Sequence, residues 1–215
     1  VECYEDENAK HSVSVENDTL VIKINNQKSW YDYIGFHLGS PKITVYLPKT
    51  EYSALIIRES TGNIKISKDF AFVNTDISLT TGNADFRASA SKSIKIKTST
   101  GNIHVENVSA GSLDLSVTTG MITISSVICE GDITVGVSTG NAILTDISCE
   151  NVLSNGTTGN ISLNHVIATE KFSIERSTGY VKFNGCDATE LYVKTSTGNV
   201  TGSLLTDKVF ITDTS

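Results

Sequence analysis

Apolar and polar residues alternate along most of this chain, in short runs that recur at a nearly constant spacing. In the stretch ESTGNIKI, residues 59–66, the apolar Ile64 and Ile66 flank the polar Lys65. Alternation with a period of two is typical of strands that bury one face. Ile, Val and Thr favour strands, and no segment carries a sustained helical period. The pattern therefore predicts an all-β protein made of short strands.

A Thr-Gly pair marks each repeat of this pattern. It occurs eight times, with 19 or 20 residues from one glycine to the next, and Asn follows the glycine in six of the eight repeats. A period near 20 residues is typical of solenoids. Gly and Asn tolerate the left-handed backbone angles of tight turns. We therefore predict that these glycines form the turn between the two strands of each repeat: Gly62, Gly82, Gly101, Gly120, Gly140, Gly159, Gly179 and Gly198.

Stacking of the repeats would bury their apolar positions, which lie seven and five residues before each glycine and two and four residues after it. A single unit of this size cannot bury its own apolar face. Stacked units bring like positions to within about 4.8 Å of one another and form one continuous core. The predicted fold is a single-domain parallel β-helix or β-roll solenoid of about eight coils. The handedness rule for parallel crossovers favours a right-handed solenoid.

The N-terminal part of the chain departs from the repeat. Residues 1–50 predict a β cap, which begins with a hairpin that turns at Asn17 and Asp18. Residues 42–48, KITVYLP, then predict a half-coil that leads into the first repeat. Residues 51–215 hold the solenoid repeats of the same continuous domain. The cap would cover the open first coil, as solenoids require.

The C-terminal stretch VFITDTS matches LYVKTST of the preceding repeat place for place. Val209 and Ile211 are therefore expected to continue the apolar columns of Leu191 and Val193. An unpaired strand at the end of a sheet is a template for another chain. We accordingly expect end-to-end self-association or dependence on further residues.

Three of the four cysteines fall in predicted buried columns. Cys186 lies seven residues after its glycine, in the column of Val166 and Leu205. In-register stacking points the thiols of Cys129 and Cys149 the same way with Cβ atoms about 4.8 Å apart, beyond the usual span of a disulfide. Free thiols are thus favoured over a disulfide. These two cysteines belong to a column of small residues nine places after the glycine: Ala71, Ser91, Ala110, Cys129, Cys149, Ala168 and Ala188.

Composition and motifs exclude several classes of function. A net charge of −7 and a pI near 5.1 argue against a nucleic-acid binder, which would carry a basic face. No apolar run reaches the ~18 residues of a membrane span, and the polar, acidic start does not read as a signal peptide. The four histidines are scattered, and no calcium, zinc or nucleotide motif occurs. We predict no metal ligand, no cofactor and no catalytic residue.

One charged cluster is the strongest candidate for catalysis. Asp85, Arg87, His104 and Glu106 face outward on adjacent coils. Glycosidases need paired carboxylates at set separations, so these residues could serve a polysaccharide-active enzyme. Opposite-charge pairing across strands on a solvated face explains the same residues. We favour the pairing and expect no enzyme.

Two further groups are candidates for binding. Trp30, Tyr31 and Tyr33 lie in a short non-repeating stretch, where exposed aromatics would contact a partner or stack on sugar rings. The alternative is that they plug the end of the solenoid. The Asn residues after the glycines could form a ladder for a ligand. We favour a structural role, in which the stacked amides bond one another along the axis.

The chain also resembles a known family. The stretch ITVYLPKTEYSALIIRESTGNIKI, which begins at Ile43, carries a strand ending in Leu-Pro, a short link, and an apolar strand leading into Ser-Thr-Gly-Asn. With the later repeats, it resembles bacterial envelope proteins labelled adhesins, whose domain is also called toastrack-like, over residues 43–215. The resemblance implies an all-β stacked fold outside the cytoplasmic membrane, often tethered by a preceding membrane segment that this chain lacks. Family members are linked to envelope-stress systems, and the family supplies no catalytic residue.

The function expected from the sequence is that of an exported, non-enzymatic scaffold of the cell envelope or cell surface with adhesin-like binding. The expected partner is a glycan or an envelope protein. Two alternatives stay open. One is a polysaccharide-active β-helix enzyme that uses Asp85, His104 and Glu106. The other is a scaffold or sensor component of an envelope-stress system.

Overall fold

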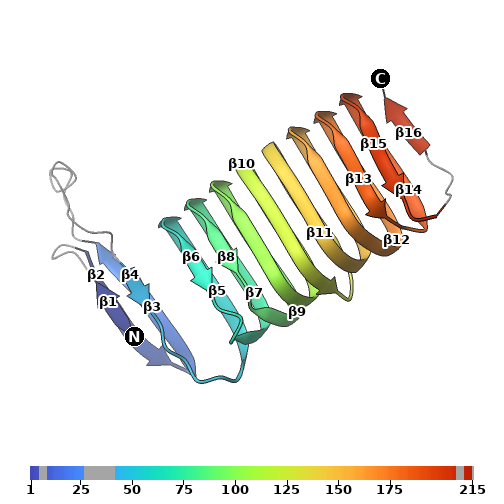
Figure 1. Ribbon diagram of the computed structural model, residues 1–215. Helices are drawn as coiled ribbons and strands as arrows, with labels where there is room; N and C mark the ends of the chain where they lie inside the picture. The colour runs from blue at the N-terminus through green and yellow to red at the C-terminus, as the bar shows by residue number, and fades with distance from the viewer. Residues whose placement is uncertain (5–8, 27–41, 207–210, 215) are drawn as a thin grey trace, which may run out of the picture. The chain divides into compact units, whose positions relative to one another are not determined.

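The structure is a computed structural model, shown in Figure 1, that describes most of the chain: residues 1–4, 9–26, 42–206 and 211–214. All regular elements of these residues are strands, and none of these residues is helical. The chain divides into two compact units, Val1–Pro48 and Lys49–Ser215. Each unit has its own strand pairing and is described by itself.

The first unit contains the predicted hairpin. β2 (Ala9–Glu16) and β3 (Thr19–Asn26) pair antiparallel along their whole length. The φ angles of 49° at Asn17 and 60° at Asp18 place both residues in the left-handed region. Two such residues in a row are typical of a two-residue hairpin turn, whose twist matches that of the strands. The predicted turn is therefore confirmed at these two positions.

The half-coil expected over residues 42–48 differs from the structure. β4 (Lys42–Thr44) pairs antiparallel with β1 (Glu2–Tyr4), with Cys3 opposite Ile43. The hydrogen-bonding partner of β4 is thus the N-terminal strand β1, whereas the sequence pattern predicted that this segment would lead into the first repeat. β4 belongs to the first unit and does not begin the parallel stack.

The second unit is a stack of parallel strands that run side by side in Figure 1. β10 (Ile103–Cys129) and β11 (Ile133–Thr158) each continue through a whole coil, and Leu113 lies opposite Ile133. The prediction of an all-β parallel solenoid of about eight turns is confirmed. The remaining strands are β5 (Glu51–Thr61), β6 (Ile64–Ile66), β7 (Ala71–Thr81), β8 (Ala84–Phe86), β9 (Ser89–Thr100), β12 (Ile161–Thr178), β13 (Val181–Cys186), β14 (Glu190–Thr197), β15 (Val200–Leu204) and β16 (Ile211–Thr214).

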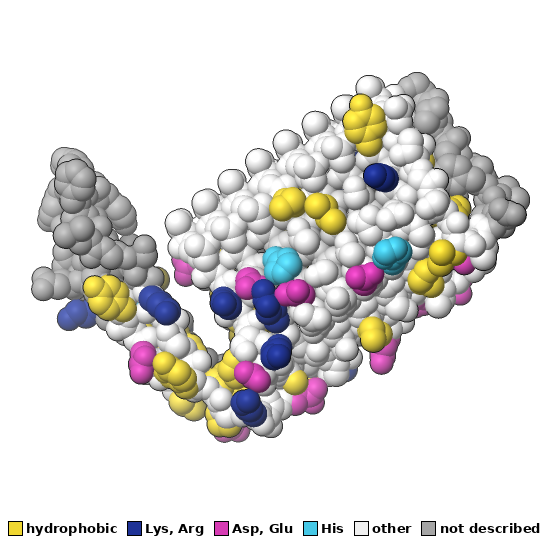
Figure 2. Space-filling model, viewed as in Figure 1, with side chains coloured by type: hydrophobic (Ala, Val, Ile, Leu, Met, Phe, Trp, Pro, Cys, Tyr) yellow, Lys and Arg dark blue, Asp and Glu magenta, His cyan; other side chains and the backbone are white. Residues whose placement is uncertain are grey.

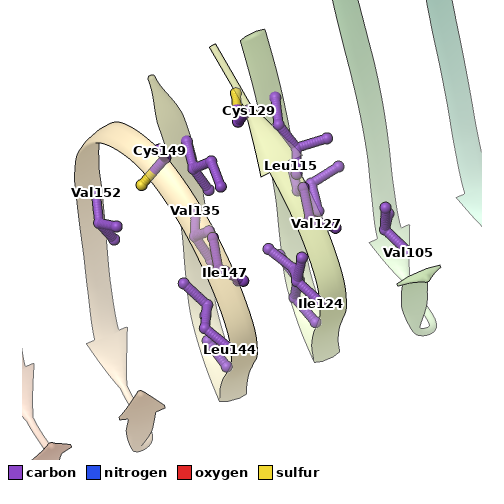
Figure 3. Packing of buried hydrophobic residues seen from close by; sticks show 14 of the residues in the cluster. Val105, Leu115, Ile124, Val127, Cys129, Val135, Leu144, Ile147, Cys149 and Val152 are labelled. Atoms are coloured by element: carbon purple, nitrogen blue, oxygen red, sulfur yellow. The ribbon is translucent and has the colours of Figure 1, made fainter. Parts of the chain in front are cut away.

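The core consists of side chains that stack on their counterparts in the next coil. Figure 3 shows three buried pairs of this kind: Leu115 with Val135, Ile124 with Leu144, and Val127 with Ile147. Burying one Val, Leu or Ile side chain contributes about 1.5–3 kcal/mol. Since the same columns recur in successive coils, the core is continuous along the axis.

The corner glycines are held by a close approach of backbones. From Gly82 to Gly198, seven of the eight glycines have φ angles of +130° to +149°. A Cβ atom on Gly140 would lie 1.8 Å from the carbonyl oxygen of Gly120 in the preceding coil. The first corner differs, because a Cβ atom on Gly62 would meet only the Glu59 Cγ atom at 3.5 Å. Glycine is therefore required where a coil precedes the corner, and not at the first corner.

A second turn, which the sequence pattern did not predict, lies six residues after the corner glycine. Its residues have φ angles between 50° and 60°, in the left-handed region. Small polar side chains and glycine tolerate this region best. The residues of this column share a backbone angle but no residue type. A comparison of residue types along the sequence therefore does not predict the turn. It comprises Asn107, Ser126, Asp146, His165 and Gly185.

Fixed spacing misplaces two members of the small-residue column, Ser91 and Ala71. Ser91 is exposed, whereas Ala90 is buried and lies opposite Ala110. In the coil before, Phe72 rather than Ala71 pairs with Ala90. The cause is a shift of register at each of these two pairings. An extra residue in one strand moves the following side chains to the opposite face.

The same kind of shift occurs near the C-terminus. Cys186 pairs with Leu204, and the expected neighbour Leu205 is exposed. In β16, Ile211 lies opposite Tyr192 of β14, one residue from its expected partner Val193. A one-residue slip exchanges the two faces of a strand. The place-for-place match of the last strand is therefore wrong in register. The expected contact of Val209 lies outside the described residues.

The three cysteines of the solenoid are buried free thiols. Burial, with smaller effects from the charges of Cys129 and Asp132, raises the pKa of Cys149 to about 12. Burial also raises the pKa of Cys129 and of Cys186. The preference for free thiols at Cys129 and Cys149 is confirmed.

We predict that substitution of a corner glycine depends on its place in the stack. Gly140→Ala should lower the free energy of unfolding by at least about 3 kcal/mol, because its Cβ atom collides with backbone and its φ is unfavourable for alanine. Gly62→Ala is the matched control and should change stability by less than about 0.5 kcal/mol. Urea unfolding of the two variants checks this. Equal losses at the two positions would contradict the stacking argument.

We also predict that the buried cysteines resist thiol reagents. At pH 8 a group with a pKa of about 12 has roughly a thousandth of the thiolate of an ordinary cysteine. Cys129, Cys149 and Cys186 should therefore be modified quickly only after unfolding in denaturant. Mass spectrometry of labelled native and unfolded protein measures this. Fast labelling of any of the three in the native protein would show that its coil opens readily.

Candidate functional site

The aromatic residues proposed as a partner contact, Trp30, Tyr31 and Tyr33, lie outside the described residues. The asparagines after the corner glycines are described, and their side chains serve the stack. Asn102 Oδ1 accepts the backbone N–H of Met121 at 3.0 Å, and Asn160 Oδ1 accepts that of Tyr180 at 2.8 Å. The expected amide-to-amide bond occurs between Asn83 Nδ2 and Asn63 Oδ1 at 2.9 Å, and the bonds at the later corners run from a backbone N–H to the amide oxygen of the preceding coil. These bonds give the asparagines the structural role that the sequence favoured.

The charged cluster is brought together as the sequence predicted, and it forms ion pairs. Arg87 Nε lies 3.0 Å from Asp85 Oδ1, and Arg87 Nη1 lies 3.0 Å from Glu106 Oε2. His104 Nε2 is 3.6 Å from the same Glu106 oxygen. Hydrogen bonding and charge from Asp85, followed by the charge of Glu106, raise the pKa of Arg87. One arginine therefore engages both carboxylates, in the cross-strand charge pairing that the sequence favoured.

Figure 2 shows that acidic, basic and histidine side chains are gathered together over the coils at the N-terminal end of the solenoid. Such a mixed arrangement is typical of cross-strand charge pairing on a solvated face. No group of three histidine, cysteine or carboxylate side chains that would hold a metal ion occurs in the described part of the chain.

A groove of about 500 Å³ runs along the axis of the solenoid beside the corner. One wall is formed four residues before each corner glycine, in six successive coils, by Lys97, Ser116, Gly136, Asn155, Glu175 and Lys194. The other wall lies two residues before the glycine and carries hydroxyl groups: Thr118, Ser138, Thr157, Ser177 and Ser196. With coils stacked about 4.8 Å apart, five steps give the groove a length of about 24 Å.

The alternation of the strands explains why the groove forms there. The two wall columns point outward, and the column between them, three residues before the glycine, points into the core. That inward column was not part of the pattern read from the sequence. Its side chains are buried in most coils: Leu79, Thr98, Val117, Val137, Arg176 and Thr195.

Arg176 is the exceptional member of this inward column, because its side chain is charged and only 4% of the residue is exposed. Its Nη2 atom donates to Ser154 Oγ at 2.9 Å, and that hydroxyl donates to the carbonyl oxygen of Val135 at 2.9 Å. Its Nε and Nη1 atoms find no acceptor among the described residues. Burial lowers the pKa of Arg176 to about 10, so the guanidinium stays protonated at neutral pH.

Two neighbouring positions accommodate this guanidinium. A Cβ atom on Gly156 would lie 2.0 Å from Arg176 Nη1, so the arginine occupies the space that a side chain there would fill. Ser154 supplies a hydroxyl in a column that is otherwise almost wholly apolar. Ser154 was visible in the sequence as an interruption of that column. Gly156 and Arg176 were missed because the column three residues before the glycine was not compared across repeats.

Together these observations define a repeat protein of the parallel β-solenoid class, with a polar axial groove over a buried arginine. The chain belongs to the Toastrack DUF4097 family, whose profile matches residues 1–138. The resemblance to a toastrack-like domain is thus confirmed at the level of the family. Ser154, Gly156 and Arg176 lie beyond the matched residues.

No curated protein and no solved structure matches the chain. The described residues contain no helix of the length and apolarity that would cross a membrane.

We predict that Arg176→Met stabilises the protein. The variant keeps a long flexible side chain and removes a buried charge that has no carboxylate partner among the described residues. Replacing buried charges by apolar groups commonly gains about 1–4 kcal/mol of unfolding free energy. Arg87→Met removes the same charge from a half-exposed ion pair and should change stability by less than about 1 kcal/mol. Urea unfolding measures both, and a loss of stability in Arg176→Met would contradict the unpaired state of the guanidinium.

Proposed function

We propose that this protein is a non-enzymatic interaction scaffold of the cell envelope, and that its axial groove binds a linear glycan. The observation that carries the proposal is the groove itself, whose hydroxyl-bearing wall repeats at the spacing of the coils. A repeating ligand would meet the same groups in each coil. The groove spans several coils, so many weak contacts would add along one chain.

The chemistry of the lining favours a sugar polymer. Serine and threonine hydroxyls both donate and accept hydrogen bonds, as sugar hydroxyls do. Sites for drug-sized ligands are mostly apolar and enclosing, whereas this groove is polar and open along its length. An extended polar polymer is the ligand class that fits such a surface.

The absence of enzymatic activity is proposed from the state of the carboxylates. Asp85 and Glu106 share one arginine, and Glu175 is the single acidic residue among the described residues that line the groove. Glycoside hydrolysis requires two carboxylates that flank the bond to be cleaved. The envelope location is proposed from the resemblance of residues 43–215 to bacterial envelope proteins.

Filling the groove tests the proposal. Ser138→Tyr places a bulky side chain on the hydroxyl-bearing wall. Ser148→Tyr makes the same change at an exposed serine that does not line the groove. In affinity electrophoresis through gels that contain soluble polysaccharides, the wild type and Ser148→Tyr should be retarded equally. Ser138→Tyr should bind about tenfold more weakly or worse. Retardation of all three proteins to the same extent, or of none by any glycan, would contradict the proposed function.

A further inference from the structure

The groove is locally positive in a protein whose net charge is −7. Three basic residues and one acidic residue line it: Lys97, Lys194, Arg176 and Glu175. Glu175 lies directly opposite Lys194 in the pairing of β12 with β14. These two charges largely offset one another, so Lys97 and Arg176 determine the sign of the remaining field.

Arg176 contributes to this field in a way that a surface lysine does not. It lies in the inward column between the two walls, where water does not screen it and where the effective dielectric constant is lower. None of the described carboxylates forms an ion pair with it, and two of its nitrogen atoms are left without acceptors. A fixed positive charge beneath a groove raises the local concentration of anions along that groove.

The position of the charge along the groove is also defined. The guanidinium lies on the inward side of Gly156, in the space that a side chain of this residue would fill, so the glycine backbone lies between the charge and the groove. Asn155 and Thr157 flank this glycine on the two walls and offer an amide and a hydroxyl. Lys97 lies three coils away along the same wall as Asn155. Lys97 and Arg176 thus place two positive charges at separate points along the groove, which suits a polymeric ligand that carries acidic groups at intervals.

We propose that the ligand of the groove is an acidic linear polysaccharide, with one of its anionic groups placed beside Gly156 over the Arg176 guanidinium. The inference rests on the proposed function, since it names the class of glycan that the same groove would bind. It also explains why one coil has an arginine in a column where the coils on either side have Gly156 and Thr195. The bound anion would supply the negative charge that Arg176 lacks among the described residues of the core.

Titration calorimetry with three soluble oligosaccharide probes tests this proposal. The probes are oligogalacturonate, which carries carboxylates, sulfated dextran oligomers, and neutral dextran oligomers of similar length. The wild type should bind the acidic probes more tightly than the neutral one. Its binding of the acidic probes should weaken as salt rises from about 50 to about 200 mM, because the added ions screen the charges more strongly. Comparison of the two acidic probes shows whether the groove binds carboxylate or sulfate groups more tightly.

The variants then locate the charge. Arg176→Met should weaken binding of the acidic probes about tenfold and leave neutral dextran unchanged. Glu175→Gln should strengthen binding of the acidic probes. Arg87→Met is the control for net charge, because Arg87 does not line the groove and its loss should leave binding unchanged. The circular dichroism spectrum of each variant verifies its fold.

The outcomes separate the inference from the proposed function. Groove binding without preference for an acidic probe, still blocked by Ser138→Tyr, would overturn the inference and leave the glycan scaffold standing. Equal binding of the acidic probes by Arg176→Met and by the wild type would overturn the role of the arginine. If none of the three probes binds, the inference and the proposed function fail together.

Discussion

At the corners of this solenoid, the backbone of one coil lies against the backbone of the next and leaves no room for a side chain. A Cβ atom on Gly159 would lie only 1.6 Å from the carbonyl oxygen of Gly140. Since glycine alone permits this approach, every later coil must bring a glycine to the same place after 19 or 20 residues. The side-chain oxygen of Asn160, which accepts the N–H of Tyr180, fixes the same corner one residue further on. The register of the whole stack depends on this column.

Register turns alternate positions of the sequence into continuous rows along the axis. The outward rows become the walls of the groove, and the inward row between them belongs to the core. A coil that carries a different residue in the inward row therefore changes the charge beneath the groove and leaves the walls intact. Arg176 is such a residue, and Ser154 and Gly156 accommodate it. An unpaired buried charge is costly for folding, which favours a role in recognition over a role in packing.

The columns and the corners were predictable because each is set by one strong local rule. Alternation with a period of two fixed the inward side chains, and the recurring Thr-Gly fixed the coils. The second turn was not predictable from residue type, since Asn107 and His165 share a backbone angle rather than a chemistry. The places of Ala90 and Leu204 in their columns were not predicted, because a fixed spacing from the glycine takes no account of a register shift. The arginine site required comparison of residues that lie side by side only after the coils have stacked.

The in-register stacking of the coils, one step per Thr-Gly, sets the position of every side chain in the solenoid. Pulsed electron paramagnetic resonance between spin labels on exposed serines two residues before the corner glycine measures this most directly. Ser60 and Ser138 are four coils apart, and Ser60 and Ser196 are seven coils apart. At about 4.8 Å per coil, the two label pairs should be separated by about 19 Å and about 34 Å. Separations that do not grow in proportion to the number of coils would contradict the stack and every position derived from it.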